Sequence, residues 1–289
     1  MLKFENPKIF EIGGVKIGGN PWESRTVLIG SIFYKGHKIV EDEKKGLFNR
    51  EMAEKLIKVQ EELSDKTGLP GFVDVVGMSE EALRKYVEFI SSVTDKPFLI
   101  DSAMPDIKIS ALRYVREVGL EKRVIYNSIT PEVKDRELTA LKESGIEAAI
   151  VLTYTTNVLS SKARVEALQK TFPKLETAGI TKPLVDTFVM DVPSLPAAVK
   201  AGIEIKKGFG FPCGSGAHNA IASWKGLRNL LGKDAEKYAV IVANTLQIAF
   251  GLDFVLYGPI DDSKLVFPAV YTLNTAYRSF SRTKDFIQI

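Results

Sequence analysis

Short, continuously apolar segments alternate with longer amphipathic segments along most of this chain. Eight apolar segments are expected to form strands, and they are TVLIGSIFY (26–34), GFVDVVG (71–77), PFLIDSA (97–103), RVIYNSI (123–129), AAIVLTY (148–154), PLVDTFVM (183–190), GFPCGSG (210–216) and FVLYGPI (254–260). All but the seventh are rich in residues that favour strands. Continuous rather than alternating apolarity is typical of strands buried on both faces in a parallel sheet.

The amphipathic segments carry signals for the ends of helices. One helix is expected to begin after Asn49 and end at Gly68, and the next to begin after Ser79. Two more should end at Gly119 and Gly145, because glycine readily adopts the left-handed conformation found after helices. Strand–helix units repeated in this way predict a (β/α)8 TIM barrel, with an open doubly wound sheet as the alternative.

The segment before the first barrel strand has a different pattern. Residues 8–19, KIFEIGGVKIGG, contain two short strand-like runs around Gly13 and Gly14, and Asn20-Pro21 then breaks the chain. We expect an N-terminal β-hairpin within residues 1–22 that has a structural role, as a plug for the barrel floor. No linker-like or low-complexity tract interrupts the sequence, so residues 1–289 are expected to form one domain.

Charge and cysteine content narrow the classes of function. The 39 basic and 36 acidic residues give a formal charge of +3, without the concentrated basic face of a nucleic-acid-binding protein. The single cysteine, Cys213, excludes an intrachain disulfide and a cysteine-rich zinc site. No apolar run is long enough for a signal peptide or a membrane span, so we expect a cytoplasmic protein.

The chemistry of a (β/α)8 barrel lies at the carboxyl ends of its strands. Three predicted strands carry an aspartate near this end, and a fourth carries an asparagine. With the loops after the first and seventh strands, the candidate substrate-binding residues are Glu41, Asp74, Asp101, Asn127, Asp186, Ser215 and Asn219. A single aspartate at such a position is often a helix cap or an ion-pair partner, but several at one mouth favour a binding site.

These residues offer oxygen and amide groups without the His and Cys ligands that transition metals prefer. Such a site suits Mg²⁺ or Ca²⁺, or a heterocycle with N–H donors and a carbonyl group. A carboxylate accepts hydrogen bonds from an amino group and a ring N–H together, and an amide both donates and accepts. The 2-amino-4-oxo edge of a pterin or guanine has this arrangement.

Other motifs are less specific. The glycine-rich residues 208–219, GFGFPCGSGAHN, match neither a P-loop nor a dinucleotide-binding fingerprint. The histidines, His37 and His218, lie in predicted mouth loops, although lone histidines more often have a structural role. Cys213 is expected to be a small buried residue, and Asn219 has an alternative role as the cap of a helix beginning at Ala220.

Longer stretches around these strand ends resemble the H subunit of tetrahydromethanopterin S-methyltransferase, a family that includes bacterial relatives acting on methyl-tetrahydrofolate. The stretches are IGSIFYKGHKIVEDEKKG (29–46), FLIDS (98–102), VIYNSI (124–129), GFPCGSGAHNAIASW (210–224) and FVLYGPIDDSKLVFPAV (254–270). The resemblance runs from about Ile12 to about Val270. It implies a pterin-binding barrel that moves a methyl group between N5 of a tetrahydropterin (tetrahydrofolate or tetrahydromethanopterin) and the cobalt of a corrinoid.

The resemblance also implies roles for individual residues. Asp101, Asn127 and Asp186 would hold the amino-oxo edge of the pterin, with Asp74 as a further candidate, and Asn219 would reach toward N5. The catalytic candidates are thus Asn219, Asp101 and Asp186, and no bound metal is expected.

The same resemblance implies partners. The chain has no D-x-H-x-x-G segment, so a separate corrinoid protein is expected to supply the cobalt. A larger methyltransferase complex is a possible assembly, and the apolar last helix, residues 265–280, favours a homodimer. The alternatives are a Mg²⁺-dependent lyase or aldolase using Asp74, Asp101 and Asp186, and a pterin-binding protein without catalytic activity.

Overall fold

Eight parallel strands close into a barrel in the computed structural model, which describes residues 2–283 and 285–289. The strands are β4 (Val27–Ile32), β7 (Gly71–Val76), β8 (Phe98–Asp101), β9 (Val124–Ile129), β10 (Ala148–Leu152), β11 (Lys182–Asp186), β12 (Cys213–Ser215) and β13 (Phe254–Pro259). Each strand pairs with the next in sequence, and β13 pairs with β4 to close the ring. The predicted (β/α)8 barrel is confirmed, and the open sheet is wrong.

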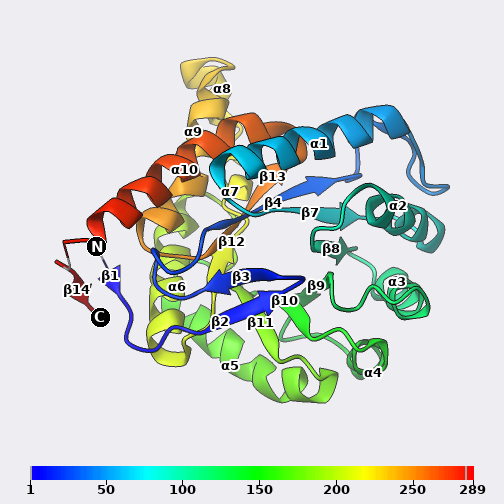
Figure 1. Cartoon of the computed structure of the whole chain (residues 1–289), viewed down its shortest axis with the longest axis horizontal. Coiled ribbons are helices and arrows are strands. Elements are labelled where there is room, and N and C mark those ends of the chain that lie inside the picture. The colour runs from blue at the N-terminus through cyan, green and yellow to red at the C-terminus, as the bar shows by residue number, and fades with distance from the viewer. Residues whose placement is uncertain (1, 284) are drawn as a thin grey trace.

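Helices surround the barrel (Figure 1). They are α1 (Arg50–Thr67), α2 (Glu80–Val93), α3 (Pro105–Glu117), α4 (Asp135–Ser144), α5 (Ser161–Ala178), α6 (Leu195–Phe209), α7 (His218–Ala222), α8 (Gly226–Leu231), α9 (Ala235–Ala249) and α10 (Ser263–Phe280). The two predicted helix N-caps are confirmed. The Asn49 side chain accepts a hydrogen bond from the Met52 N–H, and the Ser79 side chain accepts one from the Ala82 N–H. Gly68 and Gly145 follow their helices with left-handed φ angles of 69° and 76°.

All eight strands are shorter than the predicted segments, and in two of them the difference has a clear local reason. The segment predicted as 183–190 stops at Asp186, because the chain turns at Phe188, whose φ of 53° is incompatible with an extended strand. The segment predicted as 210–216 begins only at Cys213, since Gly210 still caps α6 with a φ of 72°. Helix α3 ends at Glu117, just before the predicted stop at Gly119.

The N-terminal hairpin closes the end of the barrel at which the strands begin. Strands β2 (Ile9–Ile12) and β3 (Val15–Gly18) pair antiparallel around the left-handed Gly13 and Gly14. Ile12 and Ile17 are buried in one cluster with barrel-lining residues such as Val27, the first residue of β4. Figure 1 shows the hairpin lying across the centre of the barrel. The predicted plug is therefore confirmed, and the opposite end is free to hold a site.

A buried ion pair ties this floor together. Lys206 Nζ lies 2.7 Å from Asp253 Oδ1 and donates to the Gly19 and Gly251 carbonyl oxygens at 2.9 Å and 2.8 Å. The other Asp253 oxygen accepts the backbone N–H of Cys213 at 2.9 Å. The Lys206 side chain of α6, with Asp253, thus joins the hairpin to the starts of β12 and β13. Cys213 is a buried residue of the barrel wall, as expected.

Short sheets and turns complete the fold. Strands β5 (Val40–Asp42) and β6 (Leu47–Phe48) form a small hairpin in the loop after β4. Strand β1 (Leu2–Lys3) pairs with β14 (Ile287–Gln288), so the described ends of the chain lie together, as Figure 1 shows. The 3-10 turns η1 (Val192–Ser194) and η2 (Ile260–Asp262) precede α6 and α10. In the described part of the chain, no helix is sufficiently long and apolar to cross a membrane.

Candidate active site

Asp74, on β7, organises the first part of the barrel mouth through hydrogen bonds to side chains of the adjacent strand β4 and of β9, two strands away. Its Oδ2 accepts from Ser31 Oγ of β4 at 2.9 Å, and its Oδ1 accepts from Asn127 Nδ2 of β9 at 3.2 Å. Burial raises the pKa of Asp74, while the two donors oppose that shift. Asp74 therefore fixes the orientation of the Asn127 amide, which keeps its Oδ1 and a second N–H for a ligand.

Asp101 is the carboxyl group most directly poised for a ligand. It ends β8, in register with Asn127 on β9. Burial and then the neighbouring charge of Asp74 raise the pKa of Asp101 to about 8, with a smaller opposing effect of Lys108. This raised pKa favours the protonated carboxyl group at pH 7, and a ligand with N–H donors would favour its ionisation.

Asp186 approaches the mouth from β11, across from Asp101 and Asn127. Its Oδ1 accepts the Phe188 N–H at 2.8 Å, and burial raises the pKa of Asp186 to about 6 against this bond and one from the Gly216 N–H. The fully buried Arg164 guanidinium donates to the carbonyl oxygens of Thr187 and Phe188 at 2.6 Å and 2.9 Å. Arg164 therefore holds the left-handed turn that positions Asp186.

A cavity of about 600 Å³ brings five of the predicted residues together. They are Asp74, Asp101, Asn127, Asp186 and Asn219. This volume is typical of a small-molecule site. Within residues 2–283 and 285–289, no three His, Cys, Asp or Glu side chains are grouped so that they could hold a metal ion.

Asn219 reaches the cavity from the segment after β12. Helix α7 begins at His218, so Asn219 is its second residue and the predicted helix start at Ala220 is wrong. The Asn219 side chain is exposed to the cavity, and its backbone N–H donates to the Gly216 carbonyl oxygen at 3.1 Å. The amide group is thus available to a ligand rather than used as a cap.

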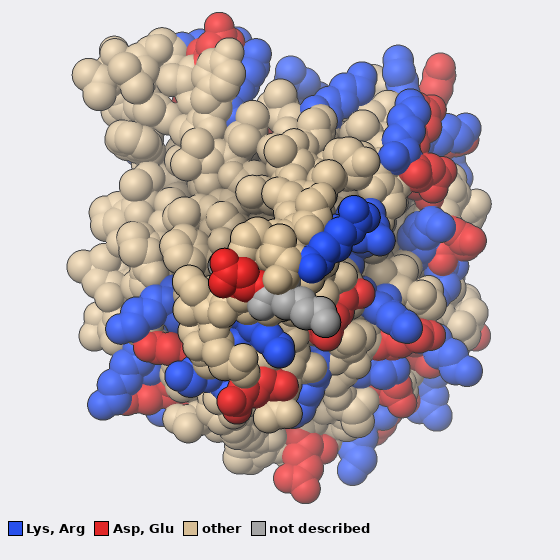
Figure 2. All heavy atoms as spheres, turned by 60° about the vertical axis from the view of Figure 1, so that its left-hand side comes forward, with Lys and Arg blue, Asp and Glu red and all other residues tan. Residues whose placement is uncertain are grey.

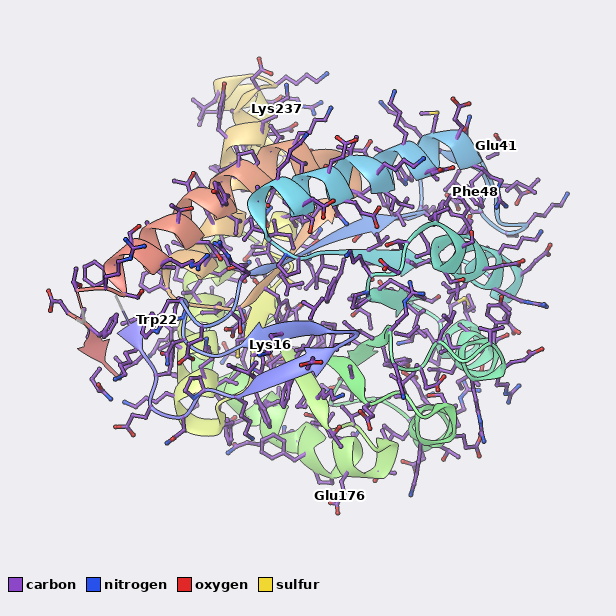
Figure 3. All side chains as sticks on the ribbon, in the orientation of Figure 1. Lys16, Trp22, Glu41, Phe48, Glu176 and Lys237 are labelled. Carbon is purple, nitrogen blue, oxygen red and sulfur yellow. The ribbon has the colours of Figure 1, made fainter. Side chains whose placement is uncertain are left out.

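The structure places two other predicted residues away from the cavity. Ser215 is 2% exposed, and its Oγ donates to Gln247 Oε1 of α9 at 3.1 Å, because successive strand residues face opposite sides of the barrel wall. Glu41 lies exposed in the β5–β6 hairpin, at the periphery in Figure 3. The backbone after Glu41 is held against α2, where the Lys44 carbonyl oxygen accepts from Ser79, so this loop packs outward instead of over the mouth.

An aromatic side chain outside the predicted set forms part of the cavity wall. The Tyr34 ring stacks on His37, with centroids 4.5 Å apart and planes 8° apart. His37 Nδ1 accepts the Phe33 N–H at 3.1 Å, so its Nε2 carries the hydrogen that faces Asp261 Oδ2 at 3.2 Å. This arrangement depends on the contact of His37, in the loop after β4, with Asp261, which follows β13. A local sequence pattern cannot predict such a contact.

His218 was noted in the sequence without a role, and the structure gives it a defined protonation state. Its Nδ1 lies 2.9 Å from the Leu256 carbonyl oxygen and must donate to it, which leaves Nε2 as the acceptor. Burial lowers the pKa of His218, so the ring is neutral at pH 7. Since His218 also lines the cavity, it contributes a neutral acceptor to the mouth.

Fold and site together define a (β/α)8-barrel protein whose mouth holds a small molecule through carboxylate and amide groups. The chain belongs to the tetrahydromethanopterin S-methyltransferase MtrH subunit family, whose model matches residues 5–289. It is 40% identical over 283 residues to the H subunit of tetrahydromethanopterin S-methyltransferase from Methanothermobacter thermautotrophicus, covering 93% of this chain and 91% of that one. The H subunit of a putative methyltransferase, mtx, from Methanosarcina mazei is 40% identical over 280 residues, covering 93% and 90%.

Solved structures with the same fold are more distant in sequence. A Yersinia pestis DHPS with a pterine-sulfa conjugate superposes with a TM-score of 0.66 at 13% identity, over 94% of this chain and 99% of that one. The dihydropteroate synthase of Xanthomonas albilineans, in complex with 7,8-dihydropteroate, gives a TM-score of 0.61 at 15% identity, over 94% and 98%. At this identity the likeness supports the barrel fold alone.

The raised pKa of Asp101 predicts that its effect on folding stability depends on pH. The pKa is 3.8 for an ordinary aspartate and about 8 in the folded chain, so between these values the folded state binds more protons than the unfolded state. The stability contributed by Asp101 is therefore complete below pH 3.8 and is lost as pH rises through 8. Asp101→Asn should exceed the wild type in urea midpoint by a margin that grows with pH.

Urea unfolding at several pH values between these limits measures this margin. Asp95→Asn is the matched control, because the Asp95 side chain is 90% exposed. Parallel pH profiles for wild type and Asp101→Asn would show that burial does not shift the titration of Asp101.

Proposed function

We propose that this chain is a methyltransferase that moves a methyl group between N5 of a tetrahydropterin and the cobalt of a corrinoid carried by a separate protein. The observation that carries the proposal is the set of Asp101, Asn127 and Asp186 around one cavity in a chain of this family. The relatives' name favours tetrahydromethanopterin, and tetrahydrofolate is the other candidate. We further propose that the reaction takes place in the cytoplasm, where the buried free thiol of Cys213 would stay reduced.

The mouth chemistry fits the amino-oxo edge of a pterin ring. An ionised Asp101 would accept from an amino group and a ring N–H, and Asn127 would use its free Oδ1 and N–H on the same edge. Asp186, held by Arg164 through the Phe188 turn, would accept from a further ring N–H. These bonds would anchor the ring without changing during methyl transfer, so their main effect should be on affinity.

Cleavage of the methyl–N5 bond requires help at the nitrogen. The methyl carbon leaves N5 and bonds to cobalt, whose electron pair forms the new bond, while the pair of the broken bond remains on N5. A proton or a strong hydrogen bond at N5 makes this nitrogen a better leaving group. The neutral Asn219 amide would donate its N–H to the lone pair of N5, directly or through a water, and so supply a hydrogen bond without full proton transfer.

Two alternative functions would give different experimental results. A magnesium-dependent lyase or aldolase would lose activity on chelation, whereas methyl transfer to added cob(I)alamin should not depend on divalent metal. A pterin-binding protein without catalytic activity would bind methyl-pterin and transfer nothing. Titration of methyl-tetrahydrofolate and methyl-tetrahydromethanopterin against the purified chain identifies the pterin.

The outer face of α9 and α10 supports a homodimer as part of this proposal. Residues 238–252 and 265–277 contain no charged residue, unlike α1, in which Lys and Glu recur. Tyr238, Val242 and Tyr271 on this face are 69%, 65% and 40% exposed. Figure 2 shows the projecting lobe at the upper left and an expanse below it with few charged atoms, whereas charges gather at the right and lower edges. A second copy covering this uncharged face would leave the mouth open to the corrinoid protein.

Alanine at Asp101, Asn127 or Asp186 should weaken binding of the methyl-pterin. A hydrogen bond to a charged partner is worth about 1.5–3 kcal/mol, so each change should raise Kd about ten- to 150-fold. Isothermal titration of the folded variants measures the change, with Glu41→Gln as a control outside the cavity. The site assignment fails if all three variants fold and bind like the wild type.

Asn219→Ala should slow methyl transfer more than it weakens binding. Loss of one preorganised donor to the reacting nitrogen should reduce the single-turnover rate by roughly ten- to a thousandfold. Pterin affinity should fall less than in Asp101→Ala, and the melting temperature should be nearly unchanged because Asn219 is not the cap of α7. A destabilised variant that keeps its rate per folded molecule would exclude the catalytic role.

Val242→Asp should dissociate the homodimer. The buried apolar contact would be replaced by a desolvated charge at the centre of the interface. Sedimentation velocity at micromolar concentration should show a dimer for the wild type and a monomer for the variant. Val118→Asp, on a 44% exposed valine at the end of α3, is the control and should remain dimeric. A monomeric wild type contradicts the proposal.

A further inference from the structure

A second groove of about 530 Å³ opens beside the mouth cavity and shares its wall. His218, Ala222 and Pro259 line both spaces and so belong to the wall that the two share. The groove runs from the end of β13 past α7 toward the lobe formed by α8 and the start of α9, which projects at the top of Figure 1. None of the predicted mouth residues lies in it, and the pterin ring would not fill it.

The inner surface of the groove is apolar and contains an aromatic ring. Ile221, Trp224, Val240 and Leu265 contribute side chains to it. Trp224 is 42% exposed although it belongs to a hydrogen-bonded turn, in which its backbone N–H donates to the Ile221 carbonyl oxygen. An exposed indole beside an aliphatic surface is suited to an aromatic ring of a ligand.

The lobe side of the groove is basic. Lys225 lines it without an ion-pair partner among the described residues, and Lys237 is engaged only with Asp234 one turn earlier, at 3.2 Å. Figure 3 shows Lys237 on the projecting lobe. Arg228 is already held by both oxygens of Glu236, at 3.0 Å and 2.6 Å, so it adds little net charge. The acidic Asp262 comes from the opposite side, next to Pro259.

We propose that this groove binds the arm of the tetrahydropterin, with its aromatic amine ring against Trp224 and its terminal carboxylates near Lys225 and Lys237. This inference rests on the proposed function. Tetrahydrofolate and tetrahydromethanopterin both carry an aryl amine on the pterin side chain and end in carboxylates. An apolar surface next to the ring site, followed by the ammonium groups of Lys225 and Lys237, matches that order of chemical groups.

The direction of the groove agrees with what the reaction requires. The methyl group must face a large docked protein, so the space above N5 has to remain clear. An arm that ran straight out of the mouth would occupy that space. An arm turned past His218 into the groove lies to one side, under the lobe, and leaves the centre of the mouth open.

Comparison of full-length and truncated ligands distinguishes binding of the arm from binding of the ring. The probes are methyl-tetrahydrofolate, methyl-tetrahydromethanopterin and 5,6-dimethyltetrahydropterin, which keeps the ring and lacks the aryl arm. The wild type should bind at least one of the full-length probes more than ten-fold more tightly than the truncated probe. Trp224→Ala and the double variant Lys225→Gln/Lys237→Gln should each weaken binding of that full-length probe about three- to thirty-fold, and added salt should reduce the effect of the lysines. Both should bind the truncated probe like the wild type.

Lys207→Gln is the matched control, because Lys207 is exposed in the last turn of α6, at the floor end of the barrel. A second readout uses Trp22→Phe, which leaves Trp224 as the single tryptophan of the chain. Its emission should change on binding of the full-length probe and not of the truncated one.

The outcomes distinguish the groove from the function on which it rests. If none of the probes binds, the proposed function fails and the groove assignment with it. If the truncated probe binds and the groove variants leave full-length binding unchanged, only the groove assignment is overturned. Equal loss for truncated and full-length probes also overturns it, because the residues would then act through the ring site or the fold.

Discussion

The cost of burying carboxyl groups in one small space governs how this site is built. Asp74, Asp101 and Asp186 each have a raised pKa, and burial is the largest cause for all three. A closed barrel forces such groups together, because neighbouring strands end at the same rim. The structure offsets the cost with donors that are themselves fixed, such as Ser31 and Asn127 on Asp74. The Ser102 backbone N–H alone donates to Asp101 among the causes that act on its pKa, so a ligand with N–H groups would supply further donors and couple binding to ionisation at this position.

The two ends of the barrel have separate tasks. The floor is closed by apolar packing of Ile12 and Ile17 and by the Lys206–Asp253 pair, in which every oxygen and donor is engaged. The mouth leaves polar groups without permanent partners and holds them with turns such as that at Phe188, where a non-glycine residue adopts a left-handed backbone. Strain and incomplete hydrogen bonding at the mouth are tolerated because the floor and the surrounding helices supply the stability.

The sequence predicts the parts of this architecture that depend on local pattern. Continuous apolar runs predicted the strands, and Asn49, Ser79 and Gly68 predicted the helix ends. The rule that strand ends form the mouth placed Asp74, Asp101, Asn127 and Asp186 near one cavity. The incorrect predictions of site residues have physical causes. Ser215 is one residue from a mouth position and faces outward because of strand alternation, and the loop with Glu41 folds back on α2. Tyr34 lines the cavity with its ring stacked on His37, and His37 in turn is held by Asp261, a residue so far along the chain that no local window contains the pair.

The stack of Tyr34 on His37, whose Nε2 faces Asp261, also has a mechanical consequence. It lies where β4 meets β13, so it closes the seam between the first and last units of the barrel. Asp261 belongs to η2, which leads directly into α10. The aromatic wall of the mouth is therefore connected to the start of an outer helix through the Tyr34–His37 stack and the His37–Asp261 hydrogen bond. Any partner that shifts the first turn of α10 moves the hydrogen-bond acceptor that orients His37, and with it the ring of Tyr34. The outside of the barrel is in this way linked to the shape of its mouth.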